Sequence, residues 1–142
     1  MKKYFLFLIV ALCVLSFSCS GGGGGDDDHG PMIANLQILA DPADLIETTT
    51  FNVGDIFYVA FEAGDEDKDI KYVILQVVNT TTSETTTPET EMELPKQDGV
   101  VMRYFIPGMA EAQDVGTSRL YIAVKDKKGN VSNPLSKTYT VH

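Results

Sequence analysis

The chain has 142 residues, no tryptophan and a formal net charge of −9 at pH 7. Phosphate backbones and anionic lipid surfaces repel so acidic a chain, which argues against nucleic acid as a partner. Both cysteines, Cys13 and Cys19, precede residue 20, so the rest of the chain has no disulfide and no thiol chemistry. The two histidines are His29, in a glycine- and aspartate-rich segment, and the last residue, His142. Neither position can hold a catalytic base rigidly, and we expect a non-enzyme without a cofactor other than a possible calcium ion.

The N-terminal residues have the pattern of an export signal. Lys2 and Lys3 precede an apolar run over residues 4–17, and small residues follow around Cys19. The run is shorter than the roughly 20 residues that a membrane-spanning helix needs. We therefore expect a segment that directs export, not a permanent transmembrane helix.

The residues Ser16-Phe17-Ser18-Cys19 resemble the cleavage site of bacterial lipoprotein signal peptides, in which a lipid is attached to the cysteine. The resemblance implies a signal peptide over residues 1–18 and Cys19 as the lipidated mature N-terminus. Ser16 and Phe17 depart from the family pattern, and ordinary secretion without a lipid is the alternative. Several acyl chains together hold a protein firmly at a membrane. The implied location is the bacterial cell envelope, on the periplasmic or surface face of a membrane, most simply the outer membrane.

Residues 19–30 contain five consecutive glycines and three consecutive aspartates. Glycine has no side chain to pack and the aspartates repel one another, so we expect an extended tether. Fully extended, it would reach about 40 Å, and as a flexible coil roughly 20 Å.

Residues 31–142 are enough for one domain with its own core. Apolar and polar residues alternate with the period of two that is typical of strands. The threonine-rich residues 79–90 predict a loop or a loosely paired edge, and Pro107 is expected to end its strand. Residues 108–116 predict a loop with at most one helical turn, and residues 126–130 a hairpin turn. The expected strands are residues 35–40, 56–61, 70–78, 90–94, 100–106, 119–125 and 137–141.

About seven strands without a helix predict an antiparallel β-sandwich. The domain resembles bacterial immunoglobulin-like and fibronectin type III-like modules. The resemblance is carried by Gly54-Asp55 before an apolar strand, by residues 65–70 and by residues 126–132 before the last strand. The domain lacks paired cysteines and tryptophan, which places the likeness with disulfide-free members. Such modules act as spacers, adhesion units or accessories that bind carbohydrate or protein.

Asp65, Asp67 and Asp69 have the spacing of alternate oxygen ligands for a hard cation such as calcium. They do not form an EF-hand, because Ile70 stands where that loop needs glycine. In a sandwich, however, the loop at Asp126 would lie at the same end as this cluster. We therefore predict a possible calcium site formed by Asp65, Asp67, Asp69 and Asp126, with a solvated acidic turn as the alternative.

Strand parity predicts that the tether enters at the same end as the acidic loops. Residues 41–52, 79–90 and 107–116 would then lie at the opposite, membrane-distal end. Two functions remain open: a structural or assembly module of the envelope, and a module that binds a polysaccharide or protein through the distal loops. Sugar binding usually uses exposed rings in one plane, so the exposure of Tyr58, Tyr72, Tyr104 and Tyr121 bears on the choice.

Overall fold

A computed structural model describes residues 30–142. The predicted signal peptide, Cys19 and the tether before residue 30 lie outside the described residues. Within them, no helix is long and apolar enough to cross a membrane. The elements are β1 (Met32–Leu39), β2 (Thr50–Phe51), β3 (Ile56–Gly64), β4 (Ile70–Asn79), β5 (Glu84–Glu93), β6 (Val101–Met109), the 3-10 turn η1 (Ala112–Asp114), β7 (Gly116–Asp126) and β8 (Leu135–Val141).

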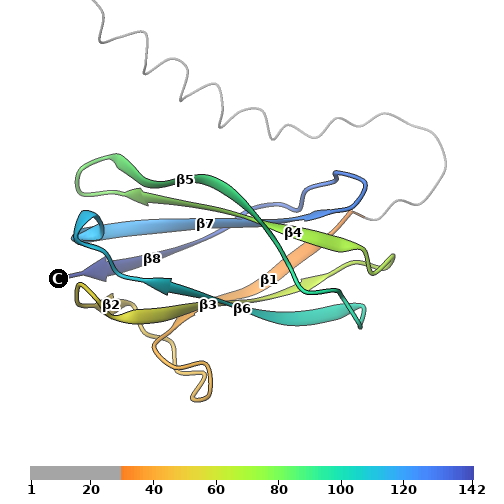
Figure 1. Cartoon of the computed structure of the whole chain (residues 1–142), viewed down its shortest axis with the longest axis horizontal. Helices are drawn as coiled ribbons and strands as arrows, with labels where there is room; N and C mark the ends of the chain where they lie inside the picture. The colour runs from red at the N-terminus through yellow and green to blue at the C-terminus, as the bar shows by residue number, and fades with distance from the viewer. Residues whose placement is uncertain (1–29) are drawn as a thin grey trace, which may run out of the picture.

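The strands form two facing sheets (Figure 1). One sheet has the order β1-β3-β6 and the other has the order β2-β8-β7-β4-β5. Leaving out the two-residue β2, the first, second and fifth long strands are β1, β3 and β6, and they share one sheet. The third, sixth and seventh long strands are β4, β7 and β8, and they share the other. This is the partition of the immunoglobulin fold, except that β5 joins the second sheet. The predicted β-sandwich is confirmed, with one departure: β2 and β8 pair in parallel.

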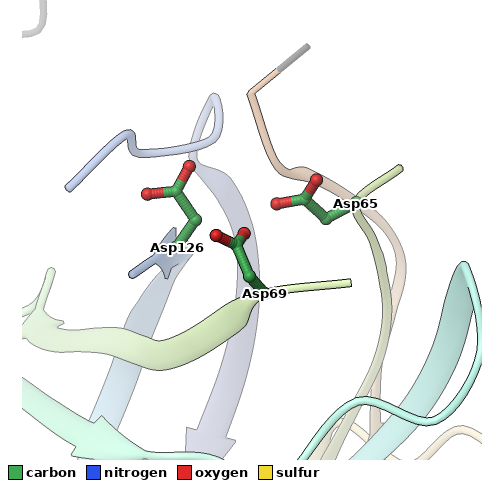
Figure 2. A group of neighbouring side chains, drawn as sticks. All are labelled: Asp65, Asp69 and Asp126. Carbon is green, nitrogen blue, oxygen red and sulfur yellow. The ribbon is translucent and has the colours of Figure 1, made fainter. Parts of the chain in front are cut away.

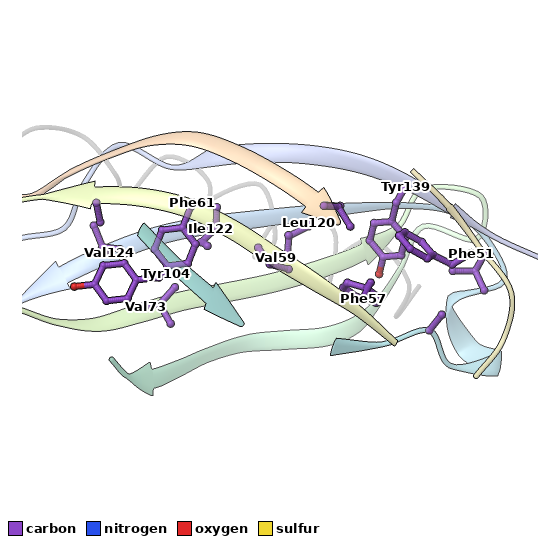
Figure 3. Close-up of a cluster of buried hydrophobic side chains, with 14 of the residues drawn as sticks. Phe51, Phe57, Val59, Phe61, Val73, Tyr104, Leu120, Ile122, Val124 and Tyr139 are labelled. Carbon is purple, nitrogen blue, oxygen red and sulfur yellow. The ribbon is translucent and has the colours of Figure 1, made fainter. Parts of the chain in front are cut away.

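The core lies between the sheets (Figure 3). In β3, Phe57, Val59 and Phe61 point inward and are at most 8% exposed, whereas Ile56 on the opposite face is 59% exposed. The ring of Phe61 stacks on that of Tyr104 with centroids 5.5 Å apart. In β3 the strand period of two therefore separates a core-facing row of side chains from an outer row.

A second aromatic cluster closes the other end of the core. Phe57 lies 5.3 Å from Phe51 and 5.6 Å from Tyr139 between ring centroids. Phe51 belongs to the short strand β2, which is held beside β8 by its parallel pairing with Val141. The two-residue strand therefore places an aromatic side chain at the edge of the core.

Of the two alternatives expected for the threonine-rich segment, the paired edge is confirmed, because the edge strand β5 pairs with β4 from Glu84 onward and only residues 80–83 remain as the turn. The expectation for Pro107 was wrong, since Pro107 does not end its strand but lies within β6 opposite Tyr58. Both β5 and β6 are edge strands. An edge strand tolerates proline and exposed polar side chains because one side of its backbone needs no strand partner.

The ends of the sandwich are arranged as strand parity predicts. A Cβ placed on Gly30 would lie 3.8 Å from the Cβ of Asn130, so the described chain enters beside the loop that follows β7. The β3–β4 and β5–β6 connections lie at this same end, where Asp65 N donates to Val100 O (3.0 Å). The loops around Gly54, Thr80 and Ala110 lie at the opposite end, where Gly54 N donates to Ala110 O (2.8 Å) and Thr80 N donates to Thr117 O (2.7 Å). Figure 1 shows these two ends at the right and left of the molecule.

Candidate metal centre

Three carboxylates meet at the end where the described chain begins (Figure 2). Asp65 directly follows β3, Asp69 directly precedes β4 and Asp126 is the last residue of β7. One oxygen from each lies within 4.8 Å of the others. Asp65 and Asp126 are buried, with 5% and 2% exposure, while Asp69 is half-buried. The structure thus brings together three of the four residues predicted for the calcium site.

Asp67, the fourth predicted ligand, is not part of this group. Its carboxylate forms an ion pair with Lys128 at 2.7 Å, and its side chain is 55% exposed. The alternation assumed for Asp65, Asp67 and Asp69 fails because the chain turns here: Lys68 N donates to Asp65 O (3.1 Å), and Lys68 has a φ of 55°. A turn of this kind takes the middle residue out of the line of its neighbours.

Hydrogen bonds hold two of the three carboxylates in place. Asp65 Oδ1 accepts the backbone N–H of Asp67 at 3.0 Å. Asp126 accepts both the backbone N–H and the side-chain amide of Asn130, each at 2.8 Å. Asn130 therefore orients Asp126. In contrast, Asp69 Oδ1 is buried and has no hydrogen-bond partner among the described residues.

Burial and the close approach of the three carboxylates change the pKa of Asp69. Burial raises the pKa of the Asp69 carboxyl above its usual value of 3.8, and the neighbouring carboxylates of Asp65 and Asp126 raise it further. The positive charge of Lys128 lowers it in part. A bound cation would offset this repulsion, and so would a proton on Asp69.

Gln97 is a structural part of this end that the sequence did not indicate. It is 3% exposed and lies in the connection between β5 and β6. Its side-chain oxygen accepts from Ile70 N (3.4 Å), and its nitrogen donates to Val100 O (2.8 Å). It thereby ties the start of β4 to the start of β6. A single glutamine in a polar stretch gives no signal of this role.

The tyrosines divide between the core and two outer faces. Tyr104 is buried at 4% exposure. Tyr72 and Tyr121 are half-buried on neighbouring strands of the five-stranded sheet, whereas Tyr58 is half-buried on the outer face of the three-stranded sheet. The ammonium groups of Lys71 and Lys125 lie 4.9 and 5.6 Å from the centroid of the Tyr72 ring. No group of three exposed tyrosine rings is present in this described part of the chain.

No protein-family model and no curated protein sequence matches the chain. Among solved structures, the domain is similar to a Niemann-Pick type C2 protein from the Japanese carpenter ant, with a TM-score of 0.54 and 9% identity over 86% of this chain and all of that chain. It is also similar to the sporulation control protein Spo0M from Bacillus subtilis, with a TM-score of 0.51 and 11% identity over 80% of this chain and 49% of that one. At such low identity the likeness shows the fold alone.

Proposed function

We propose that the chain is a non-catalytic lipoprotein of a bacterial cell envelope, held at the membrane through Cys19 and presenting one β-sandwich as a structural or assembly module. The N-terminal sequence supports the anchor, and the all-β domain with its disulfide-free core supports the role of a module. The observation that carries the proposal is the placement of the chain entry. The expected tether, residues 19–30, joins the domain at its acidic end, where Gly30 lies beside Asn130.

This placement gives the module an orientation. The acidic cluster and the loop at Asn130 would face the membrane, and the loops around Gly54, Thr80 and Ala110 would face outward. A protein or polysaccharide partner that approaches from outside would meet these distal loops first. Recognition of such a partner through the distal loops is the alternative function.

The anchor is tested by comparing two cysteine variants. We expect the mature protein to carry a diacylated Cys19 in mass spectrometry and to fractionate with membranes. Cys19→Ser should move the protein to the soluble fraction, because acylation of the cysteine supplies the membrane affinity. Cys13→Ser is the matched control and should leave the protein at the membrane. Soluble wild-type protein, or a Cys19→Ser variant that stays at the membrane, would refute the lipid anchor.

A calcium ion at the three carboxylates is a second proposal, favoured by their geometry. Calcium–oxygen distances of about 2.3–2.6 Å place two oxygens on one ion at most about 5 Å apart. The observed separations of up to 4.8 Å meet this limit. Calcium would also give the buried Asp69 Oδ1, which accepts no hydrogen bond from the described residues, a positively charged partner. Water would complete the roughly 6–8 oxygens that calcium takes.

Isothermal titration of the purified protein with calcium tests this site. Calcium at 100 times its Kd should stabilise the fold by about 2.7 kcal/mol. Asp69→Asn should abolish both the heat of binding and the thermal shift. Asp67→Asn is the matched control and should retain both, because Asp67 pairs with Lys128 outside the cluster. Absence of heat and of a thermal shift at millimolar calcium would leave a solvated acidic turn.

A further inference from the structure

A polar hollow of about 290 Å³ opens on the outer face of the three-stranded sheet. Its lining residues come from all three strands: Asn35, Leu36 and Gln37 from β1, Glu62 from β3 and Arg103 from β6. The volume is close to the lower end of ligand pockets, which begin at roughly 300 Å³. The hollow is therefore of a size for one small group, and it lies on a sheet face instead of at the distal loops.

A bulge in β1 builds one wall of the hollow. Ala34 pairs with Glu62 and Gln37 pairs with Ala60, so β1 uses one more residue than β3 over the same stretch. Asn35 within the bulge has a φ of 53°. Bulges of this kind redirect side chains and are frequent next to binding sites. Here the bulge brings the amide of Asn35 to Glu62 and leaves the amide of Gln37 beside Arg103.

Glu62 and Arg103 lie opposite each other in the register of β3 and β6. Each nevertheless bonds to an amide from β1. Asn35 Nδ2 donates to Glu62 Oε2 at 2.6 Å, and Arg103 Nη2 donates to Gln37 Oε1. Within residues 30–142, the buried Nε of Arg103 has no hydrogen-bond partner. The hollow thus offers a carboxylate acceptor, a guanidinium and two amides within one small space.

An aromatic ring stands beside these polar groups. Phe105 follows Arg103 by two residues, on the same face of β6, and is 41% exposed. The guanidinium carbon of Arg103 lies 5.5 Å from the centroid of this ring. Ala60, the small residue opposite Phe105 in β3, leaves the ring without a bulky neighbour on that strand. Arg103 therefore both lines the hollow and lies over the Phe105 ring.

We propose that this surface binds a neutral sugar residue of a glycan. Sugar hydroxyls both donate and accept hydrogen bonds, which matches the acceptor Glu62 and the donor Arg103, and the C–H groups of a sugar ring pack against an aromatic side chain such as Phe105. One positive and one negative group leave the hollow formally neutral, whereas the whole chain carries −9. An anionic sugar would gain no net attraction here and would be repelled by the rest of the protein.

This binding site differs from the distal loops considered above, and it does not depend on the lipid anchor. The test uses the purified full-length protein and isothermal titration with neutral gluco-, manno-, galacto- and xylo-oligosaccharides, beside an oligogalacturonate as the acidic comparison. We expect binding of at least one neutral oligosaccharide. Glu62→Gln, which keeps the size of the side chain, and Arg103→Met should each weaken it about tenfold or more.

Tyr121→Ala is the matched control, because Tyr121 lies on the outer face of the opposite sheet. It should bind like the wild type, and thermal melts should show that all three variants are folded. The proposal is overturned if no neutral oligosaccharide binds at millimolar concentration, if only the acidic one binds, or if folded Glu62→Gln and Arg103→Met variants bind as the wild type does. Loss of binding in Tyr121→Ala alone would move the site to the other sheet.

Discussion

Replacing Phe61 by alanine tests the assignment of the core. Phe61 is fully buried in the middle strand of its sheet and stacks on Tyr104 at 5.5 Å between centroids. Truncating a buried phenylalanine costs about 3–5 kcal/mol because the lost contacts leave a cavity. The stacked pair contributes about 0.5–1.5 kcal/mol beyond its buried area. We therefore expect Phe61→Ala to lose about 4 kcal/mol, a large part of the roughly 5–15 kcal/mol of a typical domain.

Phe105→Ala is the matched control, because it truncates the same residue type in the neighbouring strand, where the ring is 41% exposed. It should cost about 1 kcal/mol or less, as surface changes usually do. Urea unfolding followed by far-ultraviolet circular dichroism measures both. The chain has no tryptophan, so circular dichroism is a better probe than fluorescence. Equal losses in the two variants, or a loss below about 2 kcal/mol in Phe61→Ala, would refute this description of the core.

Three further outcomes concern single positions. The pKa of Asp69 is raised in the folded protein, so without metal its ionisation destabilises the fold as pH rises above the usual carboxyl range. Asparagine carries no charge, so Asp69→Asn should unfold at a higher urea concentration than wild type at pH 7. At pH 3, where Asp69 is protonated in the wild type, the two should unfold at the same urea concentration. Gly116→Ala should cost about 1 kcal/mol more than Gly129→Ala, because both have positive φ but only the first Cβ would meet a side chain, Thr81 Oγ1 at 2.7 Å. Burial raises the pKa of Tyr139 to about 12, so an absorbance titration should show a late tyrosine step that Tyr139→Phe removes.

The sequence predicted the sandwich well because its central strands carry a strong apolar pattern. In β3, the middle strand of its sheet, inward-facing and outward-facing residues alternate along the strand. The edge strands gave weaker signals. Most residues of β5 are exposed, so its sequence has no alternation of apolar and polar residues that would predict a strand. The strand forms through backbone pairing with β4, and a side-chain pattern does not reveal that pairing.

For the candidate metal centre too, local sequence was a weaker guide than the arrangement of the strands. The spacing of Asp65, Asp67 and Asp69 suggested three alternate oxygen ligands, but the turn at Lys68 takes Asp67 away from the other two. Topology was the better guide, because it brought Asp126 to the cluster from more than fifty residues away in the sequence.

Neither residue spacing nor strand topology predicted the hollow on the three-stranded sheet. Its amide groups are placed by a bulge, and its charged pair comes from strands that are adjacent only in the folded sheet. A bulge depends on one extra residue in the register of two strands, and no residue type in β1 predicts it. Asn35, Gln37 and Arg103 would each pass in the sequence as surface residues of a strand. What distinguishes them is that Glu62 and Arg103, although opposite each other, bond to amides instead of to one another. That arrangement leaves polar capacity within a small space, and this is the physical reason to look for a ligand there and not at the longer, more polar loops.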